Sequence, residues 1–123
     1  MVAPIGDSSA YLIDGDKQVV HTWKCGGGAG NSTYLLPNGV LLRTGKAQSS
    51  RFNARGGSGG VVKMIAPNNA LLWEYQVSDE NYHSHHDVEA LPNGNVLVIA
   101  WEYHSAEEAI DHGRDPSTLA GDA

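Results

Sequence analysis

The chain has 123 residues, a formal net charge of −6 and a single cysteine, so it fits one small domain without an internal disulfide. The negative charge argues against non-specific nucleic-acid binding, and no apolar run approaches the ~20 residues that would span a bilayer. The first residues lack the charged and apolar regions of a signal peptide, although an exported protein whose leader had been removed would look the same. The cellular compartment is therefore left open.

Short apolar runs separated by turn residues predict an all-β fold. In chain order, we expect strands at residues 10–13, 19–23, 34–36, 40–44, 61–66, 71–77, 87–90 and 96–100. Turns join these strands in pairs, most clearly at Asn93-Gly94, because asparagine and glycine tolerate the positive φ of tight hairpins.

Two stretches depart from this pattern. Residues 45–60 have no apolar period and are expected to form a mobile or functional loop; its GGSGG segment at 56–60 lacks the Lys-Ser/Thr of a phosphate-binding loop. Near the C-terminus, Ser105 with Glu108 predicts the capping box of one short helix. Pro116 would prevent its continuation, and residues 117–123 are expected to be unstructured.

A repeat of roughly fifty residues organises the chain, a length associated with four-stranded propeller blades. Residues 13–23 match 65–75, and residues 36–42 match 91–97. We therefore predict a partial β-propeller of about two blades of four-stranded antiparallel sheet. Its segments would be an outer hairpin at 10–25, a complete blade at 31–77, the inner hairpin of the next blade at 85–102 and a helical insertion at 105–112.

About two blades cannot close a propeller ring, and each blade needs a neighbour on both faces. The sequence therefore predicts either a fragment of a longer propeller or a short protein that self-associates through open sheet edges. We take Trp23 and Trp73 as equivalent positions of the repeat. We expect these tryptophans and Trp101 to pack between blades rather than to form an aromatic acceptor site, because large aromatics dominate core area.

The main candidate site is the histidine cluster of His83, His85 and His86 with Asp87. If these residues lie in a strand, His85 and Asp87 share one face and His86 the other; in a loop, all of them converge. Three interpretations stay open. The side chains cap the hairpin, or they line an active site in which a neutral imidazole is the nucleophile and Asp87 orients it. In the third interpretation they bind a metal ion, which needs three convergent ligands.

Basic residues are concentrated in one region without an intervening acid. Arg43 ends a predicted strand, and Lys46, Arg51 and Arg55 follow in the loop. Together they could bind an anionic substrate such as a sulfate ester. For the loop residues we favour the simpler interpretation of a solvated basic loop, and Arg43 stays open as a substrate-binding residue.

Several motifs resemble the arylsulfotransferase-like propeller family. They are VHTW at 20–23, YLLPNG at 34–39, LWEY at 72–75, HHDVEALPNGN at 85–95, WEY at 101–103 and GRDP at 113–116. The resemblance covers nearly the whole chain, but only the front part of a family member. It implies a six-bladed, exported protein that moves a sulfuryl group from a phenolic sulfate ester to another phenol through a transiently sulfated histidine, without a nucleotide donor.

The resemblance gives the cluster expected roles. His85 or His86 would be the catalytic histidine, with equal weight, and Arg43, Asp87 and His83 would bind an aromatic sulfate or a phenol. No cofactor and no resident metal are expected in this interpretation. The alternatives are a non-catalytic propeller module that binds a ligand or partner in the same channel and a metal-binding module built on the histidines.

Overall fold

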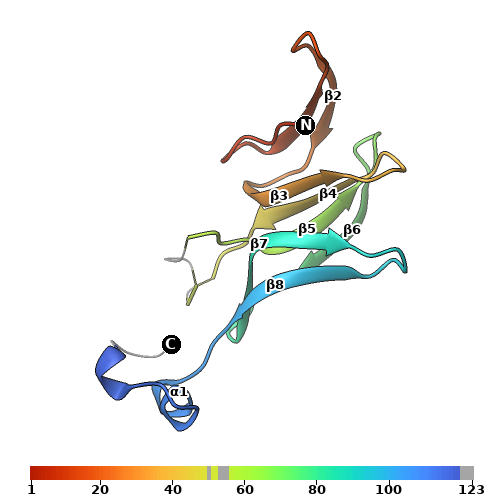
Figure 1. The fold of residues 1–123 in the computed structure, drawn as a ribbon. Helices are drawn as coiled ribbons and strands as arrows, with labels where there is room; N and C mark the ends of the chain where they lie inside the picture. Colours follow the sequence, from red (N-terminus) through yellow and green to blue (C-terminus); the bar gives the residue numbers. More distant parts are fainter. Residues whose placement is uncertain (50, 53–55, 120–123) are drawn as a thin grey trace.

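The chain forms three antiparallel sheets, seen in a computed structural model that describes residues 1–49, 51–52 and 56–119. The predicted all-β fold with one short helix near the C-terminus is confirmed (Figure 1). The strands are β1 (Ser9–Ile13), β2 (Val19–Lys24), β3 (Ala29–Leu35), β4 (Leu41–Lys46), β5 (Gly60–Ile65), β6 (Leu71–Gln76), β7 (Tyr82–Ala90) and β8 (Val96–Glu102). They are followed by α1 (Ala106–Asp111) and a 3-10 turn (Pro116–Thr118).

The four-stranded sheet β3-β4-β5-β6 is the middle layer, with the β1-β2 hairpin against one face and the β7-β8 hairpin against the other (Figure 1). Alternation along β4 produces this arrangement, because successive side chains of a strand point to opposite faces. Leu41 packs into a cluster with Ala10 and Trp23, whereas Leu42 packs into a second cluster with Val88. Both leucines are fully buried, so β4 holds the two hairpins together.

The repeat is visible in the strand register. Ala10 pairs with Trp23 in β1-β2, and Val62 pairs with Tyr75 at the corresponding place in β5-β6. Each hairpin also has one register irregularity, directly before Ile13 and directly before Ile65. The equivalent of Trp23 is therefore Tyr75, and the predicted equivalence of Trp23 and Trp73 is wrong. The match of residues 13–23 with 65–75 already places Trp23 opposite Tyr75, so pairing the two tryptophans departed from that match.

Two strands begin earlier than the apolar pattern predicts. β3 starts at Ala29 rather than Tyr34, and β7 starts at Tyr82 rather than Asp87. Both early segments are short of large apolar residues, so alternation could not identify them. Backbone pairing defines them instead, as in the pairs of Ala29 with Gly45 and of Tyr82 with Glu102.

The stretch between β4 and β5 is less solvated than predicted. Phe52 is buried, and its ring stacks on His83 with centroids 5.7 Å apart. The Cζ of Arg51 lies 3.6 Å from the ring centroid of Tyr103, a cation–π contact. Arg55, the third basic residue of the predicted loop, lies outside the described residues.

The helix forms as its capping signal predicts. The Ser105 hydroxyl accepts from the Glu108 amide, and the Glu108 carboxylate accepts from the Ser105 amide, which completes the capping box. The helix has no buried residues and extends away from the sheets (Figure 1). Residues 116–118 form a turn rather than an unstructured tail, because Asp115 caps it. Within the described part of the chain, no helix is long and apolar enough to cross a membrane.

Candidate functional site

The histidine cluster lies at a break in the β7-β8 ladder. Ser84 pairs with Ala100 and Val88 with Val98, so β7 has three residues between these pairs where β8 has one. His86 takes a left-handed backbone conformation, with φ at 55°. The bulge cancels the alternation expected of a strand, and the side chains of His85 and His86 turn toward each other.

The two imidazoles form a pair. The Nδ1 atoms of His85 and His86 lie 2.7 Å apart, and the ring of His85 stacks on Trp101 at a centroid distance of 4.4 Å. Burial, and then the neighbouring charge of His86, lowers the pKa of His85 below its ordinary value. One Nδ1 must donate while the other accepts, so one proton lies between the two Nδ1 atoms.

Strand β3 fixes this bulge from the adjacent sheet. The Ser32 hydroxyl donates to the His86 carbonyl at 2.7 Å, and the Tyr34 hydroxyl donates to Oδ1 of Asp87 at 2.7 Å. The Tyr34 hydrogen bond, followed by the amide of Val88, lowers the pKa of the Asp87 carboxyl. The same bond raises the pKa of Tyr34. Asp87 is therefore ionised at neutral pH and holds β7 against β3.

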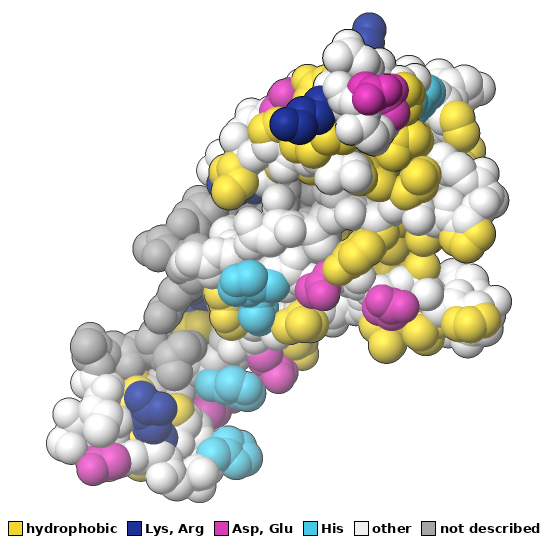
Figure 2. Space-filling model, turned by 45° about the horizontal axis from the view of Figure 1, so that its top comes forward, with side chains coloured by type: hydrophobic (Ala, Val, Ile, Leu, Met, Phe, Trp, Pro, Cys, Tyr) yellow, Lys and Arg dark blue, Asp and Glu magenta, His cyan; other side chains and the backbone are white. Residues whose placement is uncertain are grey.

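A polar recess opens where β3 and β7 meet. It has a volume of about 340 Å³ and is lined by Asn31, Ser32, Thr33, Tyr34, His86 and Asp87. His86 is exposed, whereas His85 is half-buried behind it. Figure 2 shows histidine side chains gathered midway along one face of the molecule and again toward its helical end. The recess brings together two of the predicted site residues, His86 and Asp87, with His85 hydrogen-bonded to the first.

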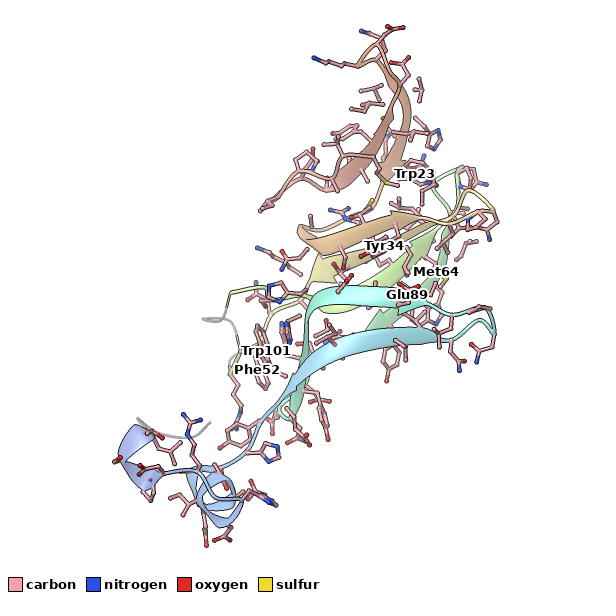
Figure 3. All side chains as sticks on the ribbon, in the orientation of Figure 1. Trp23, Tyr34, Phe52, Met64, Glu89 and Trp101 are labelled. Carbon is pink, nitrogen blue, oxygen red and sulfur yellow. The ribbon has the colours of Figure 1, made fainter. Side chains whose placement is uncertain are left out.

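His83 does not face this recess. Its ring is fully buried, with Nε2 lying 2.7 Å from the Ser58 hydroxyl and Nδ1 lying 2.9 Å from the Ser78 hydroxyl. Phe52 and Trp101 stack on the same ring, and these two aromatic side chains lie next to each other in Figure 3. Burial lowers the pKa of His83. A direct role of His83 in binding substrate at the recess is not supported by this position.

Arg43 is also separate from the histidine pair. On β4 its side chain shares the face of Leu41, toward the β1-β2 hairpin, and its Nη2 donates to the Asp7 carbonyl at 2.7 Å. It is 2% exposed, and its Nε and Nη1 have no hydrogen-bond partner among the described residues. The substrate-binding role predicted for Arg43 therefore has no support from its location.

Sequence reasoning missed Ser58, Ser78 and Phe52, which surround His83. A signal was present in the glycines that flank Ser58, because glycine often marks a close backbone approach. Gly57 has φ at 80° and its backbone lies against the His86 ring; Gly60 has φ at 112° and lies against His83. The backbone of the GGSGG segment thus packs closely against the rings of His83 and His86.

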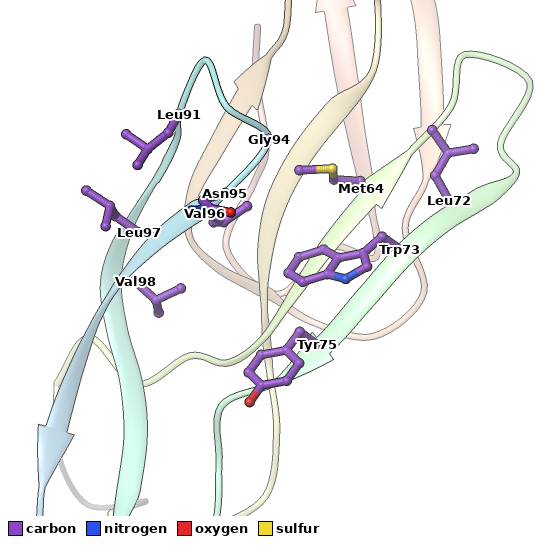
Figure 4. Close-up of a pocket in the computed structure, with 10 residues that line it drawn as sticks. All are labelled: Met64, Leu72, Trp73, Tyr75, Leu91, Gly94, Asn95, Val96, Leu97 and Val98. Carbon is purple, nitrogen blue, oxygen red and sulfur yellow. The ribbon is translucent and has the colours of Figure 1, made fainter.

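The metal interpretation finds no support among the residues described here, since they include no group of three or more His, Cys, Asp or Glu side chains that could hold an ion. A larger recess of about 740 Å³ lies between β6 and β8, lined by apolar residues that include Met64, Trp73, Tyr75 and Val98 (Figure 4). It is a hydrophobic groove without ionisable histidine, aspartate or glutamate side chains in its lining.

No family model, no curated protein and no solved structure matches this chain.

Proposed function

We propose that this chain is part of an arylsulfotransferase-like β-propeller protein that transfers a sulfuryl group between phenols, with His86 as the nucleophile. The observation that carries the proposal is the His85–His86 pair at the polar recess, with 2.7 Å between the Nδ1 atoms. His86 is preferred to His85 because His86 is exposed and lines the recess.

The pair supplies the tautomer that such a nucleophile needs. Because burial lowers the pKa of His85, this ring is neutral and can accept at Nδ1. In the tautomer that we propose, His86 donates from Nδ1 and His85 accepts, which leaves the lone pair on Nε2 of His86 free to attack. The carboxylate of Asp87, held by Tyr34, helps to fix the backbone that carries His86.

The reaction has two balanced steps. In the first, Nε2 of His86 attacks the sulfur of the aryl sulfate, the N–S bond forms, the S–O bond to the aryl group breaks, and the phenolate takes a proton from water. In the second, the acceptor phenol loses its proton to the hydroxide, its oxygen attacks the sulfur, and the N–S bond breaks. The Asn31 amide and the Thr33 hydroxyl in the lining are the groups available to the sulfuryl oxygens.

The propeller part of the proposal is supported by the sheet arrangement. β3 and β7, the first strands of successive sheets, contact each other, and they carry the recess. The groove between β6 and β8 leaves Trp73 and Tyr75 uncovered on the side where β8 has no further partner strand among the described residues. Further strands paired to β8 would cover that groove.

An assay with a chromogenic aryl sulfate and a phenol acceptor tests the proposal. His86→Ala is expected to abolish transfer, His85→Ala to reduce it by about tenfold or more, and the exposed His104→Ala to leave it unchanged. Equal rates for the His86 and His104 variants would contradict the proposal. The assay needs the protein with all of its repeats, because later strands would complete the channel.

A second candidate is a non-catalytic module that binds an aromatic ligand in the same recess. The observation in its favour is that the lining contains no Lys or Arg, so the developing charge on a sulfuryl group has no cationic partner there. Ligand binding that survives both His85→Ala and His86→Ala, together with no turnover by the complete protein, would support this candidate.

A further inference from the structure

Ser58 and His83 form a second pair of reactive groups, separate from the polar recess. The Ser58 Oγ lies 2.7 Å from Nε2 of His83, within the range in which a serine hydroxyl is activated by an imidazole base. Ser58 is half-buried, whereas the His83 ring is fully buried. The Ser58 hydroxyl is therefore partly accessible to solvent, whereas the imidazole beside it is not.

The hydrogen bonds around His83 fix its tautomer. The Ser78 hydroxyl donates its only proton to the Gln48 carbonyl at 3.3 Å, since a carbonyl can only accept. In this arrangement Ser78 accepts from His83, whose Nδ1 lies 2.9 Å away, and the ring carries its proton on Nδ1. The other nitrogen, Nε2, is left as an acceptor, and it receives the Ser58 proton.

The surroundings hold this pair rigidly. The backbone of Ser58 is bridged to His85 in β7, and the Gly59 amide donates to the Ser84 carbonyl at 2.9 Å. On the other side, Phe52 and Trp101 fix the plane of the His83 ring by stacking. Because no rearrangement is needed to align the hydroxyl with the base, the pair is organised for proton transfer before any substrate arrives.

The imidazole is also kept in its basic form. Burial disfavours the protonated ring and lowers the pKa of His83, with no charged group among the described residues contributing to the shift. The groups packed against it are the hydroxyls of Ser58 and Ser78 and the aromatic rings of Phe52 and Trp101. The other titratable side chain in this aromatic stack is His85, on Trp101.

From this geometry we propose that Ser58 is a nucleophile toward aryl esters of carboxylic acids, with His83 as its general base and Ser78 as a positioning residue. The Ser58 Oγ attacks the ester carbonyl and forms a C–O bond, while its proton moves to Nε2 of His83. The bond to the aryloxide breaks, and the aryloxide leaves with that proton. Water then gives a proton to Nε2 of His83 and attacks the acyl carbon, the bond to the Ser58 Oγ breaks, the carboxylic acid leaves, and His83 returns the proton to Ser58. Aryl esters are the proposed class because an aryloxide is a better leaving group than an alkoxide.

Labelling of the 123-residue chain with a fluorophosphonate, read by peptide mass spectrometry, tests this proposal directly. The expected adduct is a phosphonyl group on Ser58, formed as the P–F bond breaks and fluoride leaves. Ser58→Ala should remove labelling and lower para-nitrophenyl acetate hydrolysis by at least about 100-fold, whereas Ser8→Ala, an exposed serine, should change neither. An adduct on any other residue, or equal rates in Ser58→Ala and Ser8→Ala, would overturn the proposal.

The pH dependence of the labelling rate tests the role of Ser78, because substitution of a purely structural residue would not change it. In the unaltered protein, the labelling rate should rise with pH around a midpoint below the ordinary histidine value of about 6.5. Ser78→Ala should retain the fold, slow labelling about tenfold and displace that midpoint, because Nδ1 loses its acceptor. An unchanged midpoint and an unchanged rate would show that Ser78 does not position His83. Circular dichroism of each variant distinguishes loss of the fold from loss of reactivity.

Discussion

The Nδ1 atoms of His85 and His86 lie 2.7 Å apart although the two residues are sequence neighbours in one strand. In a regular strand, neighbouring side chains point to opposite faces. The left-handed backbone of His86 removes that separation. The same bulge exposes His86 to the recess and leaves His85 behind it against Trp101.

The coupling between these rings predicts how the pKa of His85 responds to a substitution. Burial is the larger cause of its lowered pKa, and the charge of His86 is the smaller one. His86→Ala should therefore raise the pKa of His85 but leave it below the ordinary value. An NMR titration of the His85 ring protons measures this, and a further decrease in the variant would contradict the described pair.

Gly57 is expected to be intolerant of a side chain. Its φ is 80°, and a Cβ atom there would collide with the His86 ring. Gly57→Ala should lower the free energy of unfolding by about 1–2 kcal/mol for the backbone alone, and by more if the ring cannot move. Gly56→Ala is the matched control, because a Cβ at Gly56 meets no atom within 4 Å. Equal stability of the two variants, measured by urea denaturation, would show that the loop does not pack on His86.

The hydrogen bond between Tyr34 and Asp87 makes a prediction about ionisation. Tyr34→Phe removes the largest cause of the lowered Asp87 pKa, so this pKa should rise toward its ordinary value. The control is Tyr82→Phe, which removes a similar bond to Glu102 at 2.9 Å. NMR titration of the side-chain carboxyl of Asp87 reads the result; an equal shift in both variants would contradict a specific bond between β3 and β7.

His83 makes stability depend on pH. Its pKa is lowered in the folded state, so the unfolded chain binds a proton first as the pH falls below about 6.5. The contribution of His83 to the free energy of unfolding should therefore be full above about pH 6.5. It should decrease as the pH falls from there through the folded-state pKa. His83→Gln should reduce this dependence without abolishing it, because the pKa of His85 is lowered too. Urea denaturation at several pH values measures the slope, and a slope equal to that of the unaltered protein would count against a buried neutral His83.

The packing of the middle sheet predicts a contrast between two leucines. Leu42 is fully buried against Val62 and Val88, so Leu42→Ala should lower the free energy of unfolding by about 2–5 kcal/mol. Leu72 is 56% exposed, and Leu72→Ala should change stability by no more than about 0.5 kcal/mol. A comparable loss in both variants would mean that the groove beside Leu72 is covered in solution.

The parts of the fold that the sequence predicts are those determined by local chemistry. Turn residues such as Asn93-Gly94 and the capping box of Ser105 each determine their local structure within a few residues. The early start of β3 at Ala29 was missed because that segment is held by pairing across the sheet rather than by its own apolar pattern.

The site was predicted less completely than the fold. The proximity of Asp87 to the histidines follows from sequence, but the bulge that pairs His85 with His86 depends on the register between β7 and β8. The contacts of His83 with Ser58 and Ser78 join segments that are 25 and 5 residues away in sequence; the glycines beside Ser58 signal a close approach but not its partner. The position of Arg43 on the opposite face required knowledge of which hairpin covers which side of β4.

The proposed sulfuryl transfer is tested most directly by peptide mass spectrometry after the complete protein is incubated with para-nitrophenyl sulfate and no acceptor. We expect one added sulfuryl group on the peptide that contains His86, and this group should be lost again when a phenol is supplied. Release of nitrophenol with the modification on a different residue, or an unmodified His86 under turnover, would contradict it.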